Sequence, residues 1–446
     1  MNTPSRPRSG LVPLLGLAVA TAHLSAGVPA VHAQRAFNLS LGPTNQGSVV
    51  LSWPAQSAIP GGGFTLVPQY QAQKSSDLKT WNPLGPTLTG MPGQPLSLID
   101  SNAGAAFYRV QSLLNEEYAQ LDNAQMTSGE LQGADFFGAS LFGATLTSAT
   151  LTGASLSGAD IRFANIAEAD LSGADLFGLE AASATCDSAT LAGVDARFSD
   201  FENASLFNVD LTGGDLSSAI LTSADTDFTV WKQVKMDANT QIDPKPKLIW
   251  QIVNRSNTNA VLTNLDLSFA TLAGVNFNHA NFSGTDLSAT DLSSADLRGA
   301  NFTLANTRFI DLRGSLLDAT TVIDSKSRLV WQILNQPAAG RDLHGTNLSS
   351  VLLVGANLIS ANLTNATCTD SVVEQANFGK ANLTRANFNS VDFFSAILTN
   401  ANLTQALFQS ADFTNANLRN AITNGASFIG AIFSNTIMPD GSIRNF

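Results

Sequence analysis

Acidic side chains recur every twenty residues in one part of this chain, and this spacing is the first feature that could support chemistry. Asp175, Asp195 and Asp215 form one such series, and Glu180 and Asp200 form a second series beside it. If the chain repeats its conformation every twenty residues, each series becomes a line of carboxylate oxygens. Hard, flexible oxygen ligands of this kind suit Ca²⁺ better than a transition metal. A calcium-binding surface is therefore one hypothesis, and a solvated acidic face without a ligand is the alternative.

The other reactive side chains favour a structural role over catalysis. Cys186 and Cys368 stand where neighbouring segments carry leucine, so we expect two buried, unpaired thiols. His279 and His344 are isolated, and no spacing of Cys and His is typical of a metal site. The three glycines at 61–63 predict a turn. Because no carboxylate pair belongs to a recognisable pocket, we predict no catalytic site, no cofactor and no enzyme activity.

Composition and charge narrow the class of protein. Of the 446 residues, 44% are hydrophobic and 13% are charged, and this charged share is roughly half of that in typical globular proteins. The net charge of -12 argues against binding to nucleic acid or to an anionic membrane, because both need basic surface. Residues 118–236 hold 16 acidic and 4 basic side chains, so essentially all of the net charge lies in this segment.

The N-terminus has the pattern of an export signal. Arg6 and Arg8 precede a mostly apolar stretch at 11–22, and small residues stand before Gln34. The apolar stretch is too short for a comfortable membrane span, and no second run of spanning length follows it. We therefore predict a signal peptide at 1–33 and an exported protein, periplasmic or extracellular, without a membrane span after cleavage.

The segment 36–113 predicts a small β-sandwich. Short apolar runs bounded by Pro and Gly are typical of strands. These runs lie at 48–53, 64–67, 70–73, 96–99 and 107–110. The segment resembles the fibronectin type III-like modules of secreted bacterial proteins, on the letters SVVLSW, SSDLKTW and AAFYRV. In that resemblance Trp53 is a core residue.

Most of the remaining chain follows a period of five residues. The letters LSGADLFG at 171–178 show the pattern: a small residue, then Asp or Asn, then Leu or Phe. We call the Leu or Phe position the centre of each repeat. Three arrays keep this period without a slip: 118–236 with 24 repeats, 262–317 with 12, and 343–433 with 19. So long a repetition predicts a solenoid.

The arrays resemble the pentapeptide repeat family, whose pattern A-(D/N)-L-x-x they follow closely. The resemblance implies an all-β fold, a right-handed quadrilateral β-helix in which four repeats make one coil of twenty residues. Centres and small residues then point inward. The expected core includes Leu171, Leu176, Cys186, Leu363, Cys368, Leu383, Phe388, Phe393, Leu403, Phe408 and Phe413.

A coil of twenty residues places like residues in columns. Two columns of phenylalanine are expected from Phe388, Phe408 and Phe428 and from Phe393, Phe413 and Phe433, and a leucine column is expected from Leu363, Leu383 and Leu403. Just before these leucines, Asn362, Asn382 and Asn402 predict a ladder of side-chain amides.

Two related insertions separate the arrays, at 237–261 and 318–342. Each predicts a tight turn and a short helix, over 248–254 and 329–335. Trp250 and Trp331 are either packed on the rod or exposed as anchors for a partner, and packing is the favoured interpretation. Residues 434–446 resemble the segments that close arrays in this family.

These features favour an exported, non-enzymatic scaffold that presents ladders of Asn, Ser, Thr and Asp to a protein or an envelope or matrix component. Some relatives in the family imitate DNA and act on gyrase, which makes an acidic DNA mimic the first alternative. An export signal argues against it, because gyrase is intracellular. Glycan or Ca²⁺-dependent surface binding is a further alternative, but we expect few exposed aromatic side chains, and this weakens the glycan hypothesis.

Overall fold

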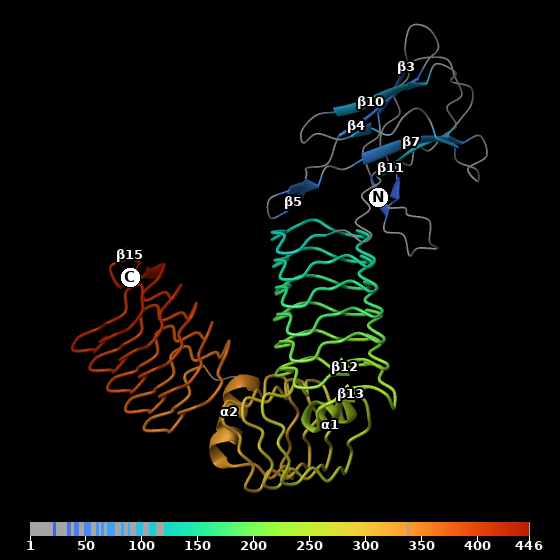
Figure 1. Ribbon diagram of the computed structural model, residues 1–446. Coiled ribbons are helices and arrows are strands. Elements are labelled where there is room, and N and C mark those ends of the chain that lie inside the picture. The colour runs from blue at the N-terminus through green and yellow to red at the C-terminus, as the bar shows by residue number, and fades with distance from the viewer. Residues whose placement is uncertain are drawn as a thin grey trace. The chain divides into compact units, whose positions relative to one another are not determined.

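A computed structural model describes residues 120–336 and 339–445 continuously, and eleven strands before them (Figure 1). Strands β1 to β11 are Thr21–His23, Gln34–Ala36, Ser40–Pro43, Val49–Pro54, Ile59–Gly61, Phe64–Leu66, Gln69–Ser75, Asn82–Pro83, Leu88–Thr89, Pro95–Asp100 and Phe107–Ser112. The later elements are β12 (Ile220–Leu221), β13 (Gln241–Ile242), α1 (Pro244–Val253), α2 (Ser325–Asn335), β14 (Thr436–Ile437) and β15 (Ile443–Arg444).

The N-terminal strands pair in antiparallel sheets. β4 pairs with β3 and β10, and β7 pairs with β8, β9 and β11. The five strands expected from the sequence correspond to β4, β6, β7, β10 and β11. The sandwich arrangement and the fibronectin-type resemblance stay predictions. Apart from β1, the predicted signal peptide lies outside the described residues.

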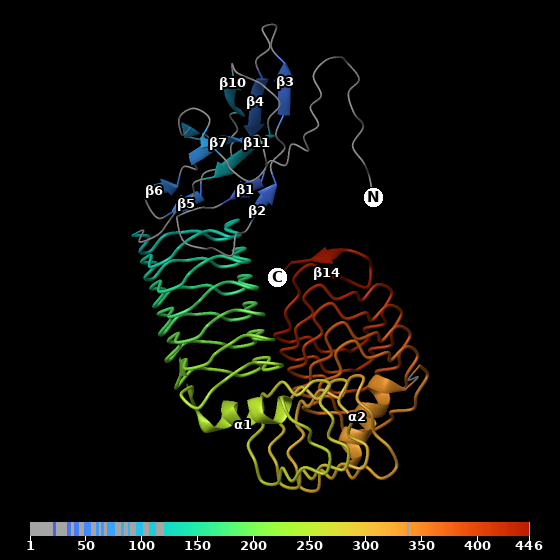
Figure 2. The same cartoon turned by 90° about the vertical axis from the view of Figure 1, so that its right-hand side faces the viewer.

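The arrays form coils of twenty residues. The residue before each centre, which we call the bridge residue, makes a parallel β-bridge to the residue twenty positions later. Gln120 pairs with Ser140 in the first array, and Asn382 pairs with Asn402 in the third. The predicted coil of four repeats is therefore confirmed. The stacked coils of the first array are visible in Figure 1, and those of the third array in Figure 2.

Each repeat turns a corner in the same way. The amide of Ala124 donates to the carbonyl of its centre, Leu121, at 3.0 Å, while Leu121 donates to Ser140 of the next coil at 2.6 Å. The two residues after a centre form the corner, and the second of them is left-handed, as at Gly133 with φ 60°. A β-turn whose third residue has positive φ favours Gly, Asn or Ser there. This explains the small polar residues that end most repeats.

The interior of the coils is apolar and closely stacked. All eleven predicted core residues are at most 1% exposed. Phe388 and Phe408 stack at 5.7 Å between ring centroids with 16° between planes, and Phe393 and Phe413 stack at 4.7 Å with 7°. Phe428 and Phe433 continue these two columns at 5.1 and 5.5 Å. Burying such rings contributes roughly 1.5–3 kcal/mol for each side chain.

The predicted ladder of asparagine amides is wrong in its bonding. Asn362, Asn382 and Asn402 do form the expected column of bridge residues. However, the Oδ1 of Asn382 accepts from the amide and hydroxyl of Thr384, and the Nδ2 of Asn402 donates to that hydroxyl at 3.1 Å. The local Asx turn forms in preference to a bond between asparagine amides of successive coils, because its partners lie only two residues away. The column is therefore a mixed Asn–Thr network.

Both insertions contain the predicted helix, but each helix begins four residues earlier than expected. Asp324 caps α2, because its side chain accepts from the amides of Lys326 and Ser327. Pro244 opens α1, and proline suits the first helical position because its missing N–H has no intrahelical partner there. The sequence interpretation used apolar residues alone and so missed both signals. No described helix is long and apolar enough to cross a membrane.

Each insertion first adds one residue to a coil. Ile220 pairs with Gln241 and Asn301 pairs with Val322, so the step is twenty-one residues at both places. Asp237 and Asp318 hold the extra residue by accepting backbone amides of the following turn. Bonds from Ser218, Thr240 and Asn239 outweigh the effect of burial and lower the pKa of Asp237 to about 2. The pKa of Asp318 is lowered as well, chiefly by the hydroxyl of Thr320.

The chain divides into two compact units, 1–226 with 232–243 and 227–231 with 244–446. In the second unit, β14 and β15 form an antiparallel hairpin at the end of the third array. Ile437 also bridges Asn417, so the coil continues four residues past the last predicted centre. The hairpin begins the closing segment that the sequence predicted for 434–446.

Candidate binding surface on the first array

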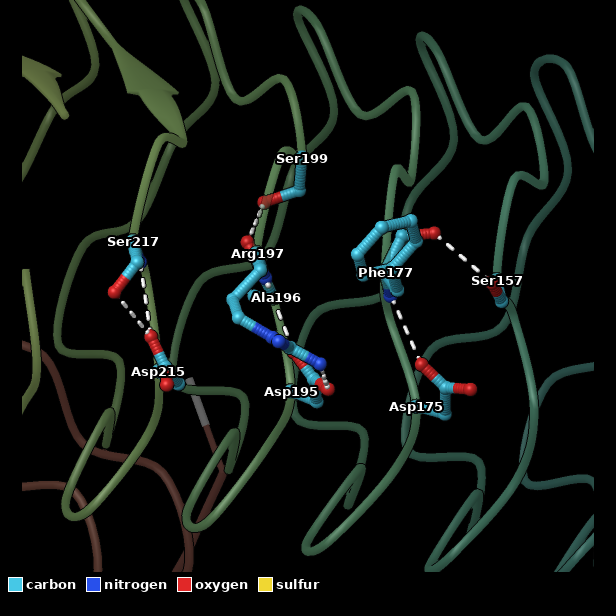
Figure 3. Close-up of polar contacts among 9 residues, drawn as sticks. All are labelled: Ser157, Asp175, Phe177, Asp195, Ala196, Arg197, Ser199, Asp215 and Ser217. Carbon is cyan, nitrogen blue, oxygen red and sulfur yellow. Dashed lines mark hydrogen bonds and ion pairs between the residues drawn. The ribbon is translucent and has the colours of Figure 1, made fainter. Parts of the chain in front are cut away.

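The predicted acidic series form two columns of bridge residues. Asp175 bridges Asp195, and Asp195 bridges Asp215, so these three carboxylates lie on successive coils (Figure 3). Glu180 bridges Asp200 in the neighbouring column. The alignment of both columns that the sequence predicted therefore agrees with the structure.

The carboxylates in the first of these columns are engaged by their own repeats. Asp175 accepts from the amide of Phe177 at 3.1 Å, and Asp215 accepts from the amide and hydroxyl of Ser217 at 3.0 and 2.6 Å. Asp195 binds the Arg197 guanidinium through both oxygens, at 2.8 and 2.7 Å. This pairing holds the pKa of Asp195 below its usual value.

The columns do not assemble a metal site. Within residues 120–336 and 339–445 no group of three or more acidic, His or Cys side chains is placed to hold a metal ion. Each aspartate of the Asp175 column is turned toward its own corner rather than toward the next coil, as Figure 3 shows. The calcium hypothesis thus finds no prearranged set of ligands on this face.

The first array also exposes phenylalanine side chains, which the sequence interpretation did not expect. Phe163 and Phe198 are 61% and 59% exposed. The others in this array are between 38% and 40% exposed: Phe137, Phe142, Phe177 and Phe207. The expectation of few exposed aromatic side chains is wrong, because it counted centres and overlooked corner positions.

Four of these phenylalanines form two pairs across adjacent coils. Phe142 and Phe163 lie 5.3 Å apart with 59° between ring planes. Phe177 and Phe198 repeat this geometry at 5.3 Å and 61°. Offset or tilted aromatic pairs of this kind contribute about 0.5–1.5 kcal/mol beyond the area that they bury.

An arginine completes each pair. The guanidinium carbon of Arg162 lies 5.9 Å from the ring centroid of Phe142, and that of Arg197 lies 5.5 Å from Phe177. Arg162 also binds Asp160 at 2.9 and 2.7 Å, which lowers the pKa of this carboxyl. We call the two groups aromatic–arginine clusters: cluster 1 is Phe142, Asp160, Arg162 and Phe163, and cluster 2 is Phe177, Asp195, Arg197 and Phe198.

The sequence holds a signal for these clusters. The letters D-x-R-F occur at 160–163 and again at 195–198, and each is preceded by a phenylalanine 21 residues before its own. Once the coil length is known, a spacing of 21 residues places two side chains at the same corner of adjacent coils. The interpretation of the bare sequence followed the centres and passed over this second pattern.

Two members of the clusters occupy an unfavourable backbone conformation. Phe163 and Phe198 have φ of 59° and 61°, in the left-handed region. Large side chains are rare there, and the conformation costs on the order of 1 kcal/mol compared with glycine. Phenylalanine at these two corners is therefore not a requirement of the coil.

Among the described residues, the others selected from the sequence form no binding or catalytic group with one another. Trp250 and Trp331 are half-buried, and the indole Nε1 of Trp331 donates to the carbonyl of Ser315 at 2.9 Å. Burial raises the pKa of the Cys186 thiol to about 12 and raises that of Cys368 as well. Both thiols are therefore packing groups and not nucleophiles. His279 and His344 are exposed.

Comparison with known proteins places the arrays in a family. The model of pentapeptide repeats matches eight copies, over 139–176, 184–222, 280–318, 342–378, 374–409 and 411–444. The coil of four five-residue repeats and this match agree, so the arrays belong to the pentapeptide repeat family, with its right-handed β-helix. No curated protein matches the chain.

Several solved structures are similar to the chain. HetL, a pentapeptide repeat protein involved in heterocyst differentiation regulation in the cyanobacterium Nostoc sp. strain PCC 7120, is 23% identical over 71% of this chain and 94% of HetL, with a TM-score of 0.18. Rfr23 from the cyanobacterium Cyanothece 51142 is 26% identical over 27% of this chain and 72% of its own, with a TM-score of 0.13. The full-length fluoroquinolone resistance protein QnrB1, which is plasmid-mediated, is 17% identical over 46% and 91%, with a TM-score of 0.15.

Proposed function

We propose that this chain is a non-enzymatic interaction scaffold that acts outside the cytoplasm, and that its first array carries the binding surface. The basic and apolar N-terminal pattern supports export. The regular β-helix within each array supports a rigid scaffold, because its backbone bonds and apolar core are repeated from coil to coil. The two aromatic–arginine clusters support the assignment of binding to the first array.

The exposed phenylalanines are the observation that carries this proposal. Aromatic side chains and arginine are enriched in protein interfaces, where a few of them supply most of the binding free energy. The clusters place both residue types together at two corners. Since Phe163 and Phe198 add strain to the corner and are mostly exposed, binding explains their presence better than folding does.

The carboxylates support a surface role and not catalysis. A general acid or base needs access to a substrate proton and a pKa close to the working pH. The aspartates of the two clusters are bound to arginine, which holds their pKa values below the usual range. Charge of this kind suits recognition of a partner.

Glycan binding is a second candidate function, because exposed aromatic rings suit sugar rings. The steep angles within both pairs, 59° and 61°, leave no flat platform formed by two rings. A protein partner fits this arrangement better, since side chains can insert between tilted rings. A function as an acidic DNA mimic is less favoured, because the apolar phenylalanines at the corners break up the negatively charged surface that such a mimic needs.

A site-specific crosslinking experiment tests the proposal in cells that make the protein. A photoreactive amino acid at Ser157, which lies one coil before Phe177 at the same corner, is expected to give a discrete protein adduct (Figure 3). The matched control is Thr399, the first corner residue of a repeat in the third array. Identical adducts from both positions, or none from Ser157, would overturn the assignment to the first array. A slow-migrating glycan adduct would favour the second candidate.

A further inference from the structure

The two aromatic–arginine clusters border one face of the first array. Residues 137 and 138 form one corner, residues 139 to 141 cross the face, and residue 142 begins the next corner. The same register places Phe177 and Phe198 at the first corner and Phe142 and Phe163 at the second. Both exposed pairs therefore flank the same strip of bridge residues.

This strip carries negative charge. We call it the acidic face, and its bridge residues on successive coils are Ser140, Asp160, Glu180 and Asp200. Arg162 neutralises part of the charge, because it binds Asp160 and its Nε lies 3.5 Å from Glu180. Arg197 is bound to Asp195 of the neighbouring column and does not compensate the face directly. Three carboxylates and one guanidinium leave a net negative strip between two apolar edges.

The charge selects the kind of molecule that can cover these apolar edges. A nucleic acid carries phosphates and would be repelled. The same face of a second copy would bring like charges together, which also opposes binding. A chain that presents basic side chains would instead meet the carboxylates while its aliphatic stems cover the rings. Lys and Arg thus satisfy the charge of the face and cover part of its edges, and apolar side chains beside them in the partner cover the rest.

The clusters already contain an example of this contact. Arg162 lies over the ring of Phe142 and Arg197 lies over that of Phe177, each with its guanidinium also paired to an aspartate. A cation above a phenylalanine ring contributes about 0.5–1 kcal/mol at an exposed site. Phe163 and Phe198 are the more exposed partners in their pairs, so they are open to a cation from another molecule.

We infer that the acidic face and its two aromatic edges bind a basic, extended segment of a protein partner. This inference rests on the proposed function and adds the chemistry of the partner. The strip from Asp160 to Asp200 spans two coil steps, or roughly 10 Å. A segment in extended conformation places alternate side chains about 7 Å apart, so two or three basic residues on one side can reach the strip.

Peptide binding to the full chain tests this inference. The probes are three fluorescent twelve-residue peptides: one alternates Lys and Leu, one alternates Glu and Leu, and one alternates Lys and Gly. Fluorescence anisotropy at about 0.15 M NaCl is expected to show that the Lys–Leu peptide binds at least ten-fold more tightly than either of the others. Equal binding of the Lys–Leu and Glu–Leu peptides would overturn the charge argument. Equal binding of the two lysine peptides would overturn the role of the apolar edges.

Variants assign the binding to this face. The double substitution Glu180→Gln and Asp200→Asn is expected to lower the affinity for the Lys–Leu peptide at least five-fold. The pair Asp370→Asn and Asp412→Asn removes the same charge from the third array and is expected to leave affinity within two-fold. Thermal melts confirm that both double variants are folded. Equal losses in the two variants would overturn the inference.

The two levels of the proposal fail separately. If the adduct at Ser157 forms but does not weaken in the Glu180→Gln and Asp200→Asn double variant, the binding surface stands and the basic partner is wrong. If the Lys–Leu peptide binds at this face but no cellular adduct forms at Ser157, the scaffold function is wrong while the chemistry of the face stands.

Discussion

The first and third arrays share one backbone plan but use phenylalanine in opposite ways. In the third array most rings lie inside and stack from coil to coil, as Phe388 does on Phe408 and Phe393 does on Phe413, and Phe394 is the exposed exception at 38%. In the first array most rings lie at corners, paired across coils and covered in part by arginine. The coil therefore separates the centres, which provide stability, from the corners and bridge residues, to which we propose to assign recognition.

The charged residues follow the same division. The first array holds 16 acidic and 4 basic residues at 118–236, whereas 341–433 holds 5 acidic and 4 basic residues. The third array covers its outside largely with Asn and Thr, which bond to each other and to their own corners. A polar surface of this kind satisfies the backbone and presents little charge to a partner.

The largest expected effect comes from a charge placed inside the third array. Leu383→Asp is expected to destabilise the protein by about 4 kcal/mol or more, because the carboxylate would be buried without a partner. Asn382→Asp, one residue earlier, is expected to cost less than about 1 kcal/mol, since its oxygen can still accept from Thr384. Chemical denaturation measures both, and equal costs would contradict the division between inside and outside.

A smaller loss of stability is expected when a phenylalanine is replaced. Phe413→Ala is expected to cost about 3–5 kcal/mol, because it opens a cavity in a stacked column. Phe198→Asn in the first array is expected to change stability by less than about 1 kcal/mol. It loses a surface ring but places a residue at φ 61° that tolerates this conformation. A cost for Phe198→Asn close to that of Phe413→Ala would show that the exposed ring is structural.

The smallest expected effect concerns pH at the end of the first array. Asp237 has a pKa of about 2 in the fold, below its unfolded value of about 3.9. Its contribution to stability is thus present above pH 4 and is lost as pH falls through about 2. Asp237→Asn is expected to be less stable than the native chain at pH 7 and equally stable near pH 2. A difference that persists unchanged at pH 2, measured by urea unfolding, would contradict this account of the turn.

The sequence predicted the coil and its core because one rule fixes both. Each centre and each small residue faces inward every five positions, and the coil of twenty residues that the family resemblance implies then aligned Leu363, Leu383 and Leu403. The side-chain hydrogen bonds were harder to predict. The amide of Asn402 could bond either to threonine or to the amide of the next asparagine in its column, and in the structure it bonds to Thr384 and Thr404. The helix starts depended on Asp324 and Pro244, which the apolar pattern does not include.

The candidate site was predicted only in part. The columns of Asp175 and Glu180 followed from the coil length, since bridge residues align every twenty positions. The clusters depend on side chains 21 residues apart that meet at one corner, and on the direction in which Phe163 leaves a left-handed residue. That direction is a property of the turn, so it becomes visible only when the backbone is built.

The central claim is that the exposed phenylalanines of the first array bind a partner and do not hold the fold together. The most direct measurement is the yield of the Ser157 adduct in a chain that carries both Phe163→Asn and Phe198→Asn. We expect this double variant to lose at least nine-tenths of the adduct while its melting temperature stays within about 3 °C of the native chain. An unchanged adduct yield in the folded double variant would contradict the claim.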